Sequence, residues 1–142
     1  MNRKLLSLLL AIALAGGLAS LTAASAKGKN PSLQMRVSPR AARSPVSVLA
    51  IAELKGGEDV EEYYCLGVEW DWDDGSKSFQ DSDCDPYEPG MKIDRRFSSD
   101  HYYSRPGKYN VVASLISAKG LVARRGVALT VREGIPQYSP GY

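Results

Sequence analysis

The stretch WDWDDGSKS, residues 70–78, decides how this chain is interpreted. Two tryptophans and three aspartates in five residues suit a carboxylate site, an aromatic platform for a sugar, or a corner where a buried strand leaves the core. Along a strand, Trp70 and Trp72 share a face. An Asp side chain accepts hydrogen bonds from the backbone two residues on, and glycine adopts positive φ without a Cβ clash. The corner needs the fewest assumptions: both tryptophans fill the core, and Asp73-Asp74-Gly75 forms the turn.

Short alternating apolar runs surround this stretch and are separated by Gly, Pro, Asp and Ser clusters, a pattern typical of antiparallel strands. Two such runs flank Ala118-Lys119-Gly120, and a glycine-containing connection of this length predicts a β-hairpin. Outside residues 1–26 no segment has helical periodicity. About seven antiparallel strands in a β-sandwich are therefore expected. They are placed at residues 33–37, 46–54, 63–72, 77–80, 92–97, 108–117 and 121–132.

The first 26 residues have the three-part pattern of a secretory signal peptide. Arg3 and Lys4 precede an apolar run, and small residues end at Ala24-Ser25-Ala26. Glycine, serine and threonine interrupt the run, whereas a membrane span needs about 20 apolar residues. We expect cleavage after Ala26 and a secreted or periplasmic protein that does not span the membrane afterwards. The expected organisation is a flexible basic leader at 27–32, one domain at 33–132 and a flexible tail at 133–142.

The charge balance does not favour a polyanionic partner. The sequence has 18 basic and 16 acidic residues, and the predicted cleavage removes two basic residues and no acid. The remaining chain is balanced, so nucleic acid is not expected as a partner. Charge is nevertheless segregated: residues 27–43 carry five basic residues and no acid, whereas residues 53–88 carry thirteen acids and two lysines. Such runs are most often solvated surface.

Cys65 and Cys84 are the two cysteines of the sequence. In a secreted chain an oxidising compartment favours their pairing. Closing a loop of this size stabilises a fold by roughly 3 kcal/mol in the chain-entropy model. If the strand at 63–72 is continuous, Cys65 points away from the tryptophans, and the bridge holds an acidic loop against the outer face of that strand. Two cysteines and one histidine are too few for a zinc site built from these ligands.

Two segments together resemble the PKD (polycystic kidney disease) domain family, in its secreted bacterial single-domain type. Residues 70–76 are similar to the family's WDFGDG motif, and residues 101–111 are similar to its H-x-Y-x-x-x-G-x-Y-x-V segment. The resemblance extends over about residues 33–132 and implies an immunoglobulin-like β-sandwich that serves as a binding or spacer module. The family motif residues carried over are Trp70, Asp71, Asp74, Gly75, His101, Tyr103, Gly107 and Tyr109.

The chain departs from the family pattern in two places. Asp73 stands where the family has glycine, so Asp73→Gly is expected to be nearly neutral. Residues 80–91 add an acidic loop with a cysteine between the two motifs. Whatever is particular to this protein is expected in that loop.

Catalysis finds little support in these residues. Asp73 and Asp74 are neighbours, whereas a glycosidase needs carboxyl groups about 5–10 Å apart across a cleft. The one histidine, His101, belongs to a family motif, so a Ser-His-Asp site is not expected. Calcium stays open because loop carboxylates are its usual ligands. However, neither Asp71 nor Asp81 begins an EF-hand loop, and the calcium ligands of some PKD-like domains find no match in residues 56–62.

Two hypotheses of different classes follow. The first is a non-catalytic module that binds an extracellular protein or carbohydrate, with no cofactor; the second is a structural or accessory subunit of an envelope or extracellular assembly, attached through its leader or its sheet edges. A calcium-binding module is a lesser alternative. The candidate partner-binding residues are Tyr87, Asp81, Asp83 and Asp85 in the acidic loop. An exposed aromatic row suited to sugars would favour the first hypothesis, and a self-complementary apolar patch or sheet edge would favour the second. The candidates for exposed aromatic residues are Tyr63, Tyr64, Tyr87 and Tyr102. The sequence leaves open the ligand, the oligomeric state, and periplasm versus medium.

Overall fold

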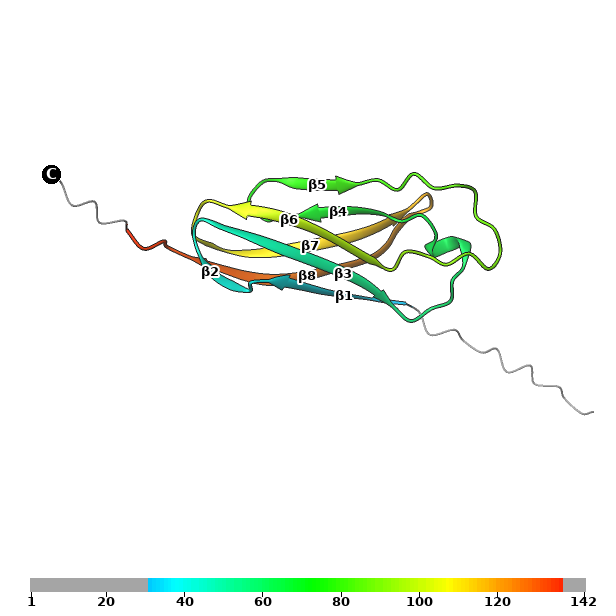
Figure 1. The fold of residues 1–142 in the computed structure, drawn as a ribbon, viewed down its shortest axis with the longest axis horizontal. Helices are drawn as coiled ribbons and strands as arrows, with labels where there is room; N and C mark the ends of the chain where they lie inside the picture. The colour runs from blue at the N-terminus through cyan, green and yellow to red at the C-terminus, as the bar shows by residue number, and fades with distance from the viewer. Residues whose placement is uncertain (1–30, 137–142) are drawn as a thin grey trace, which may run out of the picture.

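The computed structural model describes residues 31–136, which form a sandwich of two β-sheets (Figure 1). One sheet has the strand order β1-β3-β6 and the other β2-β8-β7-β4-β5. The strands are β1 (Ser32–Ser38), β2 (Ala41–Arg43), β3 (Val46–Lys55), β4 (Gly67–Asp71), β5 (Lys77–Gln80), β6 (Arg96–Tyr103), β7 (Gly107–Ser117) and β8 (Gly120–Arg132). A short 3₁₀ helix, η1 (Glu61–Tyr63), precedes β4. The expected all-β sandwich is confirmed.

The predicted signal peptide, residues 27–30 of the basic leader and residues 137–142 of the tail lie outside the described residues, and these assignments stay predictions. Within residues 31–136, no helix has the length and apolar character needed to cross a membrane.

Inward side chains of both sheets fill one core. Alternation in β3 and β7 buries every second residue over much of each strand, because successive side chains point to opposite faces. Trp70 and Trp72 are both 0 % exposed, as predicted from their shared face. The other large buried side chains are Tyr103, Leu54, Leu115, Leu129, Val48 and Val111.

One strand was not foreseen. β2 has only three residues and pairs in parallel with β8, so the sandwich has eight strands and is not wholly antiparallel. Two backbone hydrogen bonds flank this pairing, from Thr130 to the Arg40 carbonyl and from Ser44 to the Arg132 carbonyl. A segment this short has no detectable alternation, so its pairing with a strand far along the chain leaves no local signal.

Two predicted strands have the wrong limits. The strand expected at 63–72 is broken: Tyr63 belongs to η1, Cys65 has a φ of 56°, and β4 begins at Gly67. The strand expected at 92–97 is instead β6, which continues to Tyr103. Its inward positions include Ser99 and His101, so the apolar alternation that marks a strand is missing there.

Loops gather at the two ends of the sandwich (Figure 1). The corner end holds the turn between β4 and β5 and the connection between β6 and β7. The loop end holds η1, residues 81–95 and the β7–β8 turn. β1 begins at the loop end and β8 finishes at the corner end, so the chain enters and leaves at opposite ends.

Candidate functional site

The stretch at residues 70–78 forms a turn at the corner end, as predicted. The Asp71 carboxylate accepts a hydrogen bond from the Asp73 N–H at 3.1 Å, and the Asp74 carboxylate accepts one from the Ser76 N–H at 3.0 Å. Gly75 has a φ of 91°, and Asp73 has a φ of 62°. Asp73 therefore adopts the left-handed conformation that suits the glycine of the family pattern.

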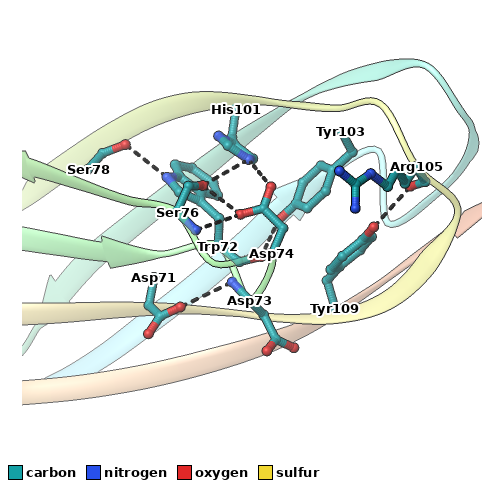
Figure 2. A network of polar contacts seen from close by, with 10 residues as sticks. All are labelled: Asp71, Trp72, Asp73, Asp74, Ser76, Ser78, His101, Tyr103, Arg105 and Tyr109. Atoms are coloured by element: carbon teal, nitrogen blue, oxygen red, sulfur yellow. Dashed lines mark hydrogen bonds and ion pairs between the residues drawn. The ribbon is translucent and has the colours of Figure 1, made fainter.

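A polar network at the corner end joins the two sheets (Figure 2). Oδ2 of Asp74, next to β4, lies 2.7 Å from Nε2 of His101 on β6. The Tyr103 hydroxyl, also on β6, donates to the Trp72 carbonyl at 2.8 Å. The rings form a continuous row, because Trp72 stacks on Trp70 at 5.9 Å and on His101 at 4.6 Å, and Tyr103 meets the edge of His101 at 4.8 Å.

Two groups in this network have shifted pKa values. Burial on its own raises the pKa of Asp74, but hydrogen bonds from the Ser76 hydroxyl, His101 and the Ser76 N–H together hold that pKa below its usual value. Burial raises the pKa of Tyr103, and the nearby Asp74 carboxylate raises it further. The phenol is therefore kept protonated, as its bond to the Trp72 carbonyl requires.

Ser76, His101 and Asp74 meet here, but their geometry is not that of a catalytic triad. A triad places the acid on one ring nitrogen and the nucleophile on the other. Here Asp74 and the Ser76 hydroxyl both approach Nε2, at 2.7 Å and 3.4 Å. The Ser76 hydroxyl also donates to the Asp74 carboxylate at 2.5 Å. The His101 ring therefore does not link a carboxylate on one nitrogen to a hydroxyl on the other. The contacts among the three side chains instead hold the corner together.

The second family segment forms another corner beside the first. The Tyr109 hydroxyl donates to the Arg105 carbonyl at 3.0 Å, which ties β7 to the preceding turn. A Cβ on Gly107 would lie 2.7 Å from Cζ of Tyr109, so only glycine allows the ring to lie there. All eight family motif residues thus lie at or beside the corner end. Gly75 supplies the positive φ of the turn, and the other seven take part in core packing or hydrogen bonds there.

The predicted disulfide between Cys65 and Cys84 is confirmed, with Cα atoms 6.0 Å apart. Its placement differs from the expectation, because Cys65 lies in the connection between η1 and β4 and not on a strand. The bridge therefore joins that connection to the acidic loop at the loop end, outside the hydrophobic core.

A groove of about 600 Å³ lies at the loop end, between the acidic loop, η1 and the outer face of the five-stranded sheet. Phe79 on β5 and Ile116 on β7 line it and are 66 % and 37 % exposed. Among the described residues that line it, the acidic ones are Glu61, Glu62, Asp81 and Asp85, and the one basic residue is Lys119. We call this hollow the loop-end groove.

The structure brings three of the four candidate partner-binding residues into the loop-end groove. Tyr87, Asp81 and Asp85 line it, whereas Asp83 lines a separate hollow with Lys92 and Asp94. The sequence reasoning missed Phe79 and Ile116. The alternation in β5 was a partial signal, because it puts Phe79 and Ser78 on opposite faces. Which of the two faces outward is fixed only in the structure, where the Ser78 hydroxyl accepts a hydrogen bond from the indole of buried Trp72.

The tyrosines do not form an exposed row. The Tyr64 and Tyr87 rings pack against each other at 5.3 Å and 58°, and their hydroxyls donate to the Asp85 and Asp59 carbonyls. Tyr63 packs against the core. Tyr102 is exposed, but it lies on β6 in the other sheet. The feature that would favour a sugar-binding surface is therefore not formed by these four tyrosines.

Metal ligands do not converge in the described part of the chain. Among residues 31–136, no three His, Cys, Asp or Glu side chains lie close enough to hold an ion together. The acids of residues 53–88 are spread over both ends of the molecule, with Asp71, Asp73 and Asp74 at the corner end.

Three features define the class: two packed sheets, the turn at residues 70–78, which we call the tryptophan turn, and the corner that Tyr109 forms with the Arg105 carbonyl. They are those of an immunoglobulin-like β-sandwich with the fold of a PKD domain. The comparison with solved structures agrees. The fold is similar to the PKD domain of an M14-like peptidase from Thermoplasmatales archaeon SCGC AB-540-F20, with a TM-score of 0.52 and 10 % sequence identity over 75 % of this chain and 99 % of that one. No family model matches the sequence, and a search of curated proteins finds no match. At this identity the likeness concerns the fold alone.

Proposed function

We propose that the protein is a non-catalytic secreted module that binds an extracellular protein or carbohydrate through the loop-end groove. The corner end, where the family motifs lie, is occupied by contacts that stabilise the sandwich. The loop end combines a disulfide, an inserted acidic loop and a hollow lined by exposed apolar side chains. Binding residues are commonly presented in this way, on loops held by a rigid scaffold.

The exposure of Phe79 and Ile116 inside the groove carries the proposal. Large apolar side chains that line a hollow mark sites of interaction more often than scattered ones do. Fully burying such a side chain stabilises a complex by about 1.5–3 kcal/mol. A partner that covers both side chains therefore gains affinity that flat contact elsewhere on the sheet would not supply.

Secretion is the second part of the proposal. The signal pattern at residues 1–26 and the Cys65–Cys84 bridge both suit an oxidising compartment outside the cytoplasm. The mature protein is expected to begin at Lys27. Intact-mass analysis of the exported product tests this, and a product that still contains Met1 to Ala26 would refute the cleavage.

Binding is tested on arrays of extracellular proteins and glycans with wild type, Phe79→Ser and Leu121→Ser. Leu121 is a matched control, because it is 64 % exposed against 66 % for Phe79 and does not line the groove. We expect Phe79→Ser to lose the binding that wild type and Leu121→Ser keep, with similar melting temperatures in all three. Equal binding by all three would reject the groove, and turnover of an arrayed peptide or glycan would reject the non-catalytic assignment.

The free sheet edges support the alternative, a structural or accessory subunit. In the described part of the chain, β5 and β6 each end a sheet and are paired with a strand on one side only. An unpaired edge is a template for pairing with another chain. In that case Lys77→Pro or Ser98→Pro would disrupt the assembly in which the protein sits, while Phe79→Ser would leave it intact.

A further inference from the structure

We infer that the loop-end groove takes an extended basic polypeptide segment that places one apolar side chain between Phe79 and Ile116. The inference rests on the proposed function and names the chemistry of its partner. Three features of the groove carry it: its charge, the shape of its floor and the engagement of its tyrosines.

The charge of the groove favours a cationic ligand. Four carboxylates in its walls, from Glu61, Glu62, Asp81 and Asp85, face one ammonium group, from Lys119. Within residues 31–136, the ion pairs of the protein involve other acids, so these four carboxylates are not neutralised by the fold. A hollow lined mainly by one sign of charge concentrates ligands of the opposite sign and speeds their association.

The floor of the groove has room for one side chain. Gly67 on β4 lies between β5 and β7, the strands that carry Phe79 and Ile116. Its neighbours leave ordinary van der Waals space for a Cβ, since the nearest atoms would be the Gln80 carbonyl oxygen at 3.5 Å, the Ile116 carbonyl oxygen at 3.8 Å and Oδ1 of Asp81 at 3.9 Å. Ile116 lies directly opposite Gly67, and Phe79 lies opposite Glu69, two residues further along the same face of β4. The absent side chain of Gly67 thus leaves a gap beside Ile116 and diagonal to Phe79, which suits an aliphatic side chain of a ligand.

The tyrosines disfavour a sugar in the same place. A carbohydrate needs flat aromatic faces and free polar groups beside them. Tyr64 and Tyr87 instead pack against each other, and both hydroxyls already donate to backbone carbonyls. A polypeptide segment needs neither group, because its lysine or arginine side chains reach the carboxylates of the walls.

The test is isothermal titration calorimetry on the mature full chain with three short synthetic peptides. The first has a leucine between two lysines, the second replaces the leucine with serine, and the third replaces both lysines with glutamates. We expect the first peptide to bind at least about tenfold more tightly than either other peptide, a preference that shrinks at high salt because exposed charges are screened.

Three variants place the binding in the groove. Asp81→Asn with Asp85→Asn should weaken binding of the first peptide by about tenfold, and Asp100→Asn, which neutralises an exposed acid on the other sheet, should leave it unchanged. Gly67→Leu should also abolish binding, because its side chain fills the gap. Thermal unfolding of each variant checks that the sandwich is intact. The serine peptide keeps both lysines and lacks the leucine, so a variant that weakens both peptides equally has lost only the electrostatic part of the binding.

The outcomes separate this inference from the proposed function. Groove-dependent capture of a glycan or of a neutral peptide, without binding of the first peptide, would overturn the inference and keep the proposed function. No groove-dependent binding of any kind would overturn both. If the double variant Lys27→Ser, Lys29→Ser bound the peptide more tightly than wild type, the occupant of the groove would be the chain's own leader. If wild type were a dimer and Gly67→Leu a monomer, the occupant would be a second copy of the chain. Either result overturns the inference.

Discussion

Asp73 and Asn110 are joined by a hydrogen bond from the Asn110 backbone N–H to the Asp73 carboxylate, at 2.7 Å. The bond ties the tryptophan turn to β7, the strand that carries Tyr109. It is made by the residue that departs from the family pattern, in a backbone conformation with a φ of 62°. Asp73 thus replaces the conformational freedom of glycine with a tertiary contact.

This contact makes Asp73 a test of two opposed effects. Asp73→Gly removes the cost of a left-handed conformation, about 1–2 kcal/mol, and loses the stabilisation by a hydrogen bond, which is about as large. We therefore expect the unfolding free energy to change by less than about 1 kcal/mol. Asp73→Ala loses the bond and keeps the unfavourable backbone, so it should be less stable than the glycine variant by about 1 kcal/mol. Urea unfolding measures both, and equal stabilities would contradict the role of the backbone.

Trp70 tests the core. Trp70→Ala should lower the unfolding free energy by about 3–5 kcal/mol, as large-to-small core substitutions do. Asp73→Gly on the exposed turn serves as its control. If both variants were equally unstable in urea, Trp70 would not be the core residue that its 0 % exposure indicates.

The two tryptophans differ in one polar contact. The Trp72 indole donates to the Ser78 hydroxyl at 2.9 Å, whereas Nε1 of Trp70 is buried and has no hydrogen-bond partner among residues 31–136. Trp72→Phe breaks a hydrogen bond, and Trp70→Phe removes an unsatisfied donor. We therefore expect Trp72→Phe to be less stable than Trp70→Phe by about 1 kcal/mol. Chemical denaturation followed by circular dichroism makes the comparison, and the opposite order would show that ring volume outweighs the polar contact.

The disulfide is expected to stabilise the fold without being needed for it. Cys65→Ser with Cys84→Ser should lower the unfolding free energy by roughly 3 kcal/mol, because the bridge constrains the unfolded chain. For a domain of this size that corresponds to a fall in melting temperature of about 10–20 °C. Calorimetry measures the shift, and circular dichroism checks that the β-sheet signal persists. Two free thiols in the exported wild-type protein would show that the pairing does not form.

The Asp74 carboxylate should make the corner sensitive to acid. Its pKa is lower in the folded protein than the usual value of about 3.9, so its stabilising contribution is complete above that pH. The contribution is lost as the pH falls through the lower folded value. Wild type should therefore lose more stability between about pH 6 and pH 3 than Asp74→Asn, in which this titration is absent. Parallel slopes for the two proteins would mean that the hydrogen bonds to Asp74 do not favour its ionised form.

Local chemistry explains which features could be predicted from the sequence. The tryptophan turn depends on hydrogen bonds between residues two apart, such as the one from the Ser76 N–H to the Asp74 carboxylate. The residue types of the stretch are therefore enough to predict the turn. β2 depends on pairing with β8, and the groove depends on β4 pairing with both β5 and β7, which places Phe79 opposite Glu69 and Ile116 opposite Gly67. Cys65 was placed on a strand because no residue type there indicates its left-handed backbone. Features made by distant segments leave no such trace in a single sequence.

The path of the chain has a mechanical consequence. β1 begins at the loop end, and β8 finishes at the opposite end of the sandwich (Figure 1). A pulling force applied between Ser32 and Arg132 acts along the strands and loads the seven residue pairs of β1 and β3 together, in shear. Strands that start and finish at one end would instead be peeled apart pair by pair. A domain held at both ends of residues 32–132 is therefore expected to resist mechanical unfolding, because all the hydrogen bonds between β1 and β3 must break together.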